Sequence, residues 1–147
     1  KKIEEIEKFC GNQNCPLIYI CAKLEHEISQ LSSIEKKEFL MSYGIEKSGL
    51  DEFIFAGYNL LGLSTFFTAG PKELKAWTYR SGMLAPETAG VIHTDFQRGF
   101  IRAEVISYDD FIKYNGETGS KNNGKMRIEG KDYVVQDGDI IFFRFNV

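Results

Sequence analysis

The sequence predicts an α+β fold with a mixed sheet, on the basis of three observations. Apolar residues before Gly62 recur at helical spacing, whereas those after Gly62 fall in short runs typical of β-strands. Two helical stretches, residues 85–94 and 108–114, separate some of these runs and give the order ββαβα followed by further strands. We therefore expect a domain boundary close to Gly62, with helices before it and a helix-covered sheet after it.

The first 24 residues have the pattern of the end of an α/β unit. Ile3, Ile6 and Phe9 have helical spacing, and the apolar run 16–22 predicts a short buried strand. Such a strand normally pairs inside a larger parallel sheet. We therefore expect the chain to start within a larger domain.

Two amphipathic helices are expected before the boundary. Apolar residues alternate with charged ones over residues 25–43, and Gly44 is a natural stop for that helix. A second helix is predicted over residues 50–61, with Ser48 and Gly49 at its entry. Together they form a helical segment over residues 25–61.

Six β-like runs follow Gly62. They are residues 64–70, 73–80, 101–107, 126–130, 132–135 and 139–147. A tight turn with Gly138 at positive φ is expected before the last run. That run places apolar side chains on both faces of the sheet, so we expect its second face to meet residues 25–61 or a domain outside this chain.

The composition excludes several classes of protein. Eighteen basic and 21 acidic side chains give a net charge of −3, which argues against charge-driven binding of duplex nucleic acid. Three cysteines without a preceding secretion signal predict free thiols. No segment has the roughly 20 apolar residues that cross a bilayer, so we expect a soluble, cytoplasmic protein without membrane contact.

Several stretches resemble the carboxy-terminal part of Obg-like ATPases of the YchF family. They include GLSTFFTAGPKELKAWTYRSGMLAPETAGVIHTDFQRGF, GKMRIEGKDYVVQDGDIIFFRFNV and, before Gly62, CAKLEHEISQL and YNLLGL. The resemblance implies a β-grasp (ubiquitin-like) TGS domain at residues 62–147. It also implies a helical connecting segment at 25–61 and, at 1–24, the last helix and strand of a P-loop nucleotide-binding domain.

The resemblance also implies what the family does. Its members hydrolyse ATP and associate with ribosomes, so the full-length protein is expected to use ATP or GTP with magnesium. No G-x-x-x-x-G-K-[ST] string occurs in this chain. We therefore expect the chain itself to hold no cofactor and not to be an enzyme. Cys21, Ala22 and Lys23 match a family loop that flanks the base and ribose, with Cys21 in place of the usual serine.

Two chemical hypotheses are weaker. His93 and Asp95 suggest acid–base catalysis, but no nucleophile accompanies them, and a structural role in which His93 hydrogen-bonds backbone at a helix end is favoured. The cysteines and His26 lack the paired spacing of a zinc site, so no metal site is predicted.

Basic side chains interleave with aromatic ones after Gly62, a mixture typical of RNA contact. The alternative is a solvated sheet edge whose aromatics belong to the core. The residues proposed for ribosome or RNA contact are Lys72, Lys75, Arg80, His93, Arg98 and Arg102. A second hypothesis is that the module packs on the nucleotide-binding and coiled-coil domains of the parent without touching nucleic acid.

Overall fold

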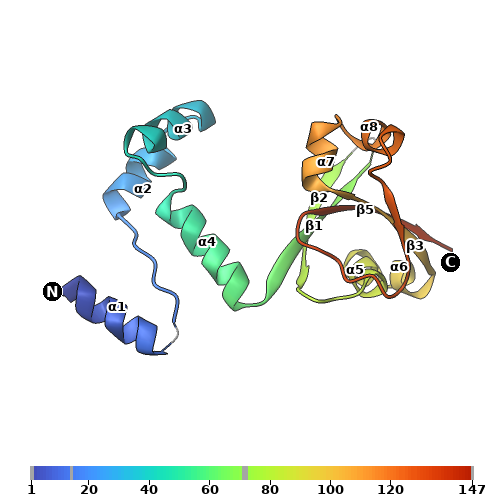
Figure 1. The fold of residues 1–147 in the computed structure, drawn as a ribbon, viewed down its shortest axis with the longest axis horizontal. Helices are drawn as coiled ribbons and strands as arrows, with labels where there is room; N and C mark the ends of the chain where they lie inside the picture. The colour runs from blue at the N-terminus through green and yellow to red at the C-terminus, as the bar shows by residue number, and fades with distance from the viewer. Residues whose placement is uncertain (1, 14, 71–72, 147) are drawn as a thin grey trace. The chain divides into compact units, whose positions relative to one another are not determined.

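We describe the chain from a computed structural model, which covers residues 2–13, 15–70 and 73–146. The chain divides into two compact units, Lys1–Leu61 and Gly62–Val147. We call them the helical unit and the sheet unit. Figure 1 shows helices alone in the first and a sheet with helices in the second.

The helical unit departs from prediction at its beginning. The predicted first helix is confirmed, but its apolar residues Ile3, Ile6 and Phe9 are exposed, and no residue described in it is buried. The predicted strand at residues 16–22 is wrong, because residues 15–21 have no regular structure and Tyr19 and Ile20 are about half exposed. A strand needs a neighbour for its backbone hydrogen bonds. The described part of this unit contains no strand to supply one.

A single helix over residues 25–43 is also wrong, because Ser32 starts a new helix within that range. Its Oγ accepts a hydrogen bond from the Glu35 N–H, and the Glu35 carboxylate accepts one from the Ser32 N–H at 2.9 Å. This capping box satisfies amide donors that only a helix start leaves free. The helices of the unit are α1 (Lys2–Gln13), α2 (Ala22–Ser29), α3 (Ser33–Ser42) and α4 (Gly49–Leu60). Ser48 caps α4, as predicted.

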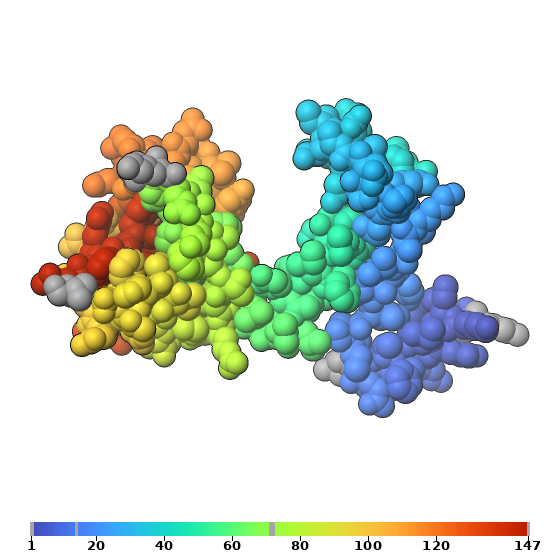
Figure 2. All heavy atoms as spheres, turned by 180° about the vertical axis from the view of Figure 1, so that it is seen from behind, coloured from blue at the N-terminus to red at the C-terminus, as the bar shows by residue number. Residues whose placement is uncertain are grey.

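The sheet unit contains the mixed sheet that the sequence predicts. Its strands lie in the order β2-β1-β5-β3-β4, and the central pair, β1 and β5, is parallel whereas all other neighbours are antiparallel. The strands are β1 (Leu63–Ala69), β2 (Leu74–Arg80), β3 (Phe100–Ser107), β4 (Arg127–Glu129) and β5 (Asp139–Phe145). Figure 2 shows the green atoms of the first strands beside the red atoms of the last one.

In the described residues of this unit, four helices lie beside the sheet. They are α5 (Ala85–Ile92), α6 (Thr94–Arg98), α7 (Tyr108–Lys113) and α8 (Glu117–Asn122). The predicted helix over 85–94 ends at Ile92, because His93 is extended and starts α6. Neither α6 nor α8 was predicted. Figure 1 shows α5 and α6 on one side of the sheet and α7 and α8 on the other.

The core lies between the sheet and α5. Phe66 is completely buried, and its ring meets those of Tyr79 and Phe143 edge-on at 5.7 and 5.9 Å. Ala85 and Ala89 of α5 are also fully buried, since small side chains let the helix approach the sheet closely.

The second face of the sheet is partly covered within the same unit, a source of cover that the expectation of residues 25–61 or another domain did not include. Ile106 and Ile140 on that face are 0% and 3% exposed. Tyr108 of α7 lies 6.0 Å from the Phe67 ring, measured between centroids. A helix that follows β3 directly can therefore fold back over this face.

The predicted strand at 132–135 is wrong. Two backbone hydrogen bonds join this segment to the start of α5 and the residues before it: the Tyr133 carbonyl accepts from the Ala85 N–H, and the Val135 N–H donates to the Met83 carbonyl. A single bridge between Leu84 and Val134 results. The Tyr79 hydroxyl adds a bond to the Val135 carbonyl at 2.9 Å, and burial raises the pKa of Tyr79 to about 12. The turn with Gly138 at positive φ is confirmed.

Replacement of Gly119 in α8 by alanine should destabilise the sheet unit. A Cβ there would overlap the carbonyl oxygen of Tyr114, so we expect a loss of about 1–3 kcal/mol in the free energy of unfolding. Urea unfolding followed by Trp77 fluorescence measures this loss.

Gly57→Ala in α4 is the matched control, because a Cβ there meets nothing within 4 Å. Helical circular dichroism should show that it stabilises α4 by about 0.5–1 kcal/mol. Equal effects of the two substitutions would contradict the predicted contact.

Candidate functional site

The exposed part of the second sheet face carries two arginines from neighbouring strands. Side chains alternate along a strand, so Arg102 and Glu104 of β3 share a face with Phe142 and Arg144 of β5. The register places Arg102 opposite Arg144 and Glu104 opposite Phe142, and Ile128 of β4 is the next partner of Glu104. We call these five residues the arginine face.

Glu104 holds both arginines in place. Arg144 donates to its Oε2 at 2.8 Å and Arg102 to its Oε1 at 3.1 Å, so each carboxylate oxygen has one guanidinium partner. The Glu104 side chain is 11% exposed, whereas those of Arg102 and Arg144 are 49% and 53% exposed. The hydrogen bond from Arg144 is the main cause that keeps the pKa of Glu104 below its usual value; desolvation opposes it.

Glu104 is a functional candidate that sequence reasoning missed, and Arg144, one of the basic residues interleaved with aromatic ones, was not among those proposed for ribosome or RNA contact. Arg144 stands in the apolar run of β5, and its alternation with Phe143 and Phe145 indicates a polar face there. Its pairing with Arg102 depends on the strand order, which one sequence without its fold does not reveal.

Of the predicted contact residues, Arg102 alone belongs to the arginine face. Lys75 lies on the same face of β2 as the core residue Tyr79, because the two are four positions apart, and this face is opposite to the arginine face. The Lys75 ammonium lies 4.0 Å from the centre of the Trp77 ring. Arg80 is exposed at the far end of β2, opposite Leu63. Lys72 lies outside the described residues.

His93 and Arg98 lie at the two ends of α6. The His93 Nδ1 accepts a hydrogen bond from the Asp95 N–H at 3.2 Å and so caps α6, which confirms the structural role predicted for this histidine. Its side chain is 60% exposed. Arg98 is exposed at the last position of the helix. The predicted contacts are therefore dispersed over both sides of the sheet.

The aromatic residues considered for base stacking mostly belong to the core. Tyr79 and Phe100 are buried, and Trp77, Phe96 and Tyr133 pack against the same cluster. These five rings therefore agree with the alternative of a solvated sheet edge whose aromatic residues belong to the core. The basic side chains remain at the surface.

Cys21, Ala22 and Lys23 lie at the start of α2. Cys21 is its exposed N-cap and makes no side-chain capping bond, and the Lys23 side chain is 87% exposed. The adjacent hollow of about 360 Å³ is lined by Cys21, by the acidic residues Glu25 and Glu52 and by the basic residue Lys47. The role of Cys21, Ala22 and Lys23 beside a base and ribose stays a prediction.

Glu25 instead has a structural contact. Its Oε1 accepts a hydrogen bond from the Gly49 N–H at 2.7 Å, which joins α2 to the start of α4. A Cβ on Gly49 would lie 3.1 Å from the Tyr19 carbonyl oxygen. The absence of a side chain at Gly49 therefore allows this close approach.

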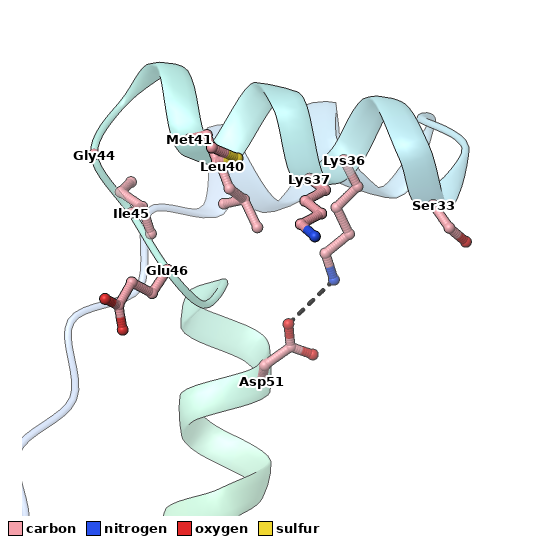
Figure 3. A pocket seen from close by; sticks show the side chains of 9 residues that line it. All are labelled: Ser33, Lys36, Lys37, Leu40, Met41, Gly44, Ile45, Glu46 and Asp51. Carbon is pink, nitrogen blue, oxygen red and sulfur yellow. Dashed lines mark hydrogen bonds and ion pairs between the residues drawn. The ribbon is translucent and has the colours of Figure 1, made fainter. Parts of the chain in front are cut away.

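The helical unit has a second hollow, of about 640 Å³, between α3 and the start of α4 (Figure 3). Leu40 and Ile45 form its apolar part, and Lys36 closes one side with an ion pair of 3.1 Å to Asp51. The hydrogen bonds to Asp51 from Ser48 and then from Lys36 lower the pKa of its carboxyl. These groups hold α3 against α4.

In the part of the chain that the structure describes, no group of three or more His, Cys, Asp or Glu side chains is placed to hold a metal ion. No described helix has the length and apolarity needed to cross a membrane.

Residues 63–146 match the family model YchF-GTPase_C, which is described as a protein of unknown function (DUF933). The chain is 53% identical over 147 residues to a Bacillus subtilis protein named ribosome-binding ATPase YchF. It is 54% identical over 145 residues to a Pasteurella multocida protein of the same name. The chain spans 40% of the length of each of these relatives.

Two solved structures are similar to the chain. The structure of the Schizosaccharomyces pombe YchF GTPase matches 98% of this chain and 38% of its own, with a TM-score of 0.82 and 34% identity. A GTP-binding protein from Pyrococcus horikoshii matches 98% of this chain and 41% of its own, with a TM-score of 0.65. The second match has 18% identity and shows a likeness of fold alone.

Stability of the sheet unit should depend on the ionisation of Glu104. Because its pKa in the folded state is lowered, the stabilisation is complete above its unfolded pKa and is lost as the pH falls through the folded value. Because the arginines are half exposed, we expect Glu104→Gln to lower the free energy of unfolding by about 1 kcal/mol at pH 6. The loss should be smaller at pH 3, where less of the wild-type side chain is ionised. Urea unfolding by Trp77 fluorescence at both pH values measures this. A cost that does not change with pH would refute the role of the charge.

Proposed function

Because this chain belongs to the YchF family, we propose that it is a binding and regulatory module of a ribosome-associated, nucleotide-hydrolysing protein. The observation that supports this most directly is the identity of 53–54% across nearly the whole chain to relatives named ribosome-binding ATPase. The arginine face supplies a surface through which such a module can contact RNA phosphates.

The proposal assigns a role to each part of the chain. Residues 62–147 are a TGS domain of the β-grasp type, which is supported by a mixed five-stranded sheet with a central parallel pair and α5 packed on one face. Residues 25–61 are a helical connecting segment, and residues 1–24 are the end of a nucleotide-binding domain. Ile3, Ile6 and Phe9 of α1 are exposed, which favours a protein neighbour that covers residues 1–24.

The hydrolytic activity belongs to the whole protein in this proposal. The names of the relatives include both an ATPase and a GTPase, and a triphosphate with magnesium is the expected substrate complex of either. Cys21, Ala22 and Lys23 would complete its base and ribose site together with residues outside this chain. The expected compartment is the cytoplasm, where ribosomes and triphosphates meet.

A second candidate function is regulation within the parent protein without contact to nucleic acid. The apolar surface of α4 favours it, since Phe53, Ile54 and Phe55 are all more than half exposed. Side chains of this kind are normally covered by a partner. In this view the sheet unit controls access to the nucleotide site of the parent.

Binding of the chain to purified ribosomes should weaken progressively as salt is raised. Lysine and arginine contacts release counterions from phosphates, so the logarithm of the affinity should fall linearly with the logarithm of the salt concentration. Co-sedimentation from about 50 to 200 mM salt measures the slope. A ribosome complex insensitive to salt would contradict phosphate contact.

Deletion of residues 62–147 from the whole protein separates the two candidates. If the module acts within the parent, the deletion should change the rate of nucleotide turnover in the absence of ribosomes. Steady-state hydrolysis measures this, and circular dichroism verifies that the remaining domain is folded. Unchanged turnover together with lost ribosome binding would support the first candidate and exclude the second.

A further inference from the structure

The arginine face combines fixed cations with apolar surface. Arg102 and Arg144 stand opposite each other on adjacent antiparallel strands, and one carboxylate, that of Glu104, pairs with both. Paired arginines lose less side-chain freedom on binding an anion than arginines free in solvent, because part of their ordering has already occurred. Each guanidinium has five N–H donors, and its bond to Glu104 involves one nitrogen, so further donors remain for a ligand.

Apolar side chains continue this face on both sides of Glu104. Phe142 is its register partner on β5 and is half-buried, and Ile128 is its partner on β4 and is 69% exposed. A row of aromatic and aliphatic groups across neighbouring strands can receive the flat faces of unpaired bases, while adjacent arginines meet the phosphates. This is the chemistry of single-stranded rather than duplex recognition.

Charge decides between kinds of ligand. A guanidinium group can bind a phosphate in bidentate geometry. Arg102 and Arg144, which are register partners, can therefore make two such contacts. The net charge of −3 and the dispersal of the other basic residues disfavour a duplex, which needs a concentrated basic surface. A negative neighbour of this site is Glu117 at the start of α8, which interacts electrostatically with Arg144.

We propose that the arginine face binds single-stranded RNA, with Arg102 and Arg144 contacting phosphates, Phe142 and Ile128 contacting bases, and Glu104 positioning both arginines. This inference rests on the proposed function and names the surface that performs it. It predicts that ribosome contact by the sheet unit takes place through unpaired ribosomal RNA. Lys75, His93 and Arg98 are then secondary contacts, because they do not lie on this face.

The test uses the 147-residue chain and a fluorescein-labelled, 12-nucleotide single-stranded RNA of mixed sequence, with affinity measured by fluorescence anisotropy. Arg102→Gln and Arg144→Gln should each weaken binding about 5-fold. Each should also make the salt slope shallower by about 0.7, the contribution of one phosphate contact on a single strand. Each variant leaves Glu104 with one arginine, so the fold is retained, and Trp77 fluorescence verifies it.

Two further variants make the result specific. Glu117→Gln removes a negative charge beside Arg144 and should tighten RNA binding about 2-fold, an increase that unfolding could not produce. Lys113→Gln with Lys131→Gln removes two exposed positive charges outside the strands. This control should change affinity less than 2-fold.

Ribosome co-sedimentation with the same variants separates the failure of this inference from the failure of the proposed function. Parallel loss of RNA and ribosome binding in the arginine variants supports the inference. Ribosome binding lost with RNA binding unchanged overturns it, because the face then contacts a ribosomal protein. If both remain unchanged, the inference is wrong and the proposed function stands. A wild-type chain that binds neither overturns both.

Discussion

The sheet unit depends on the parallel pairing of its first and last strands, which Thr65 secures. The Thr65 N–H donates to Asp137 Oδ1 at 2.7 Å, and the Thr65 carbonyl accepts from the Gly138 N–H at 2.8 Å. Gly138 has a φ of 81°, which a residue without Cβ adopts at little cost. One turn thus joins the two ends of the unit and places Phe67 opposite Ile140.

That register determines which side chains lie inside and which lie outside. With β5 fixed between β1 and β3, Ile141 and Phe143 enter the core beside Phe66, and Arg144 is placed on the opposite face. A shift of β5 by one residue would exchange these two sets, because side chains alternate along a strand. The same constraint therefore maintains the hydrophobic core and assembles the arginine face.

Much of the fold could be predicted from local pattern. The five strands that the structure contains, the helix at Gly49–Leu60 and the turn at Gly138 follow from alternation, capping residues and glycine, all of which act over a few residues. The failures involve longer-range effects. Residues 16–22 look like a strand but have no neighbouring strand in the described part of their unit, and Ser32 divides an apparently continuous helix through a capping box.

The candidate site was predictable only in part for the same reason. Arg102 is recognisable as a basic residue in a strand, whereas its relation to Arg144 arises from a strand order that local pattern does not encode. His93 was expected to hydrogen-bond backbone at a helix end, and its Nδ1 does so at the start of α6. Trp77 and Tyr79 satisfied a pattern that suits both a core and a stacking surface, and burial decided between the two.

The small core of the helical unit has a consequence for its dynamics. Ile28, Leu40 and Ser48 are the buried side chains among the described residues of this unit, whereas ordering each residue costs about 1–2 kcal/mol of conformational entropy. Helix α1, with no buried side chain described, therefore has little to oppose local opening. Its amide hydrogens should exchange with water far faster than those of β3, where Ala103, Val105 and Ile106 are fully buried.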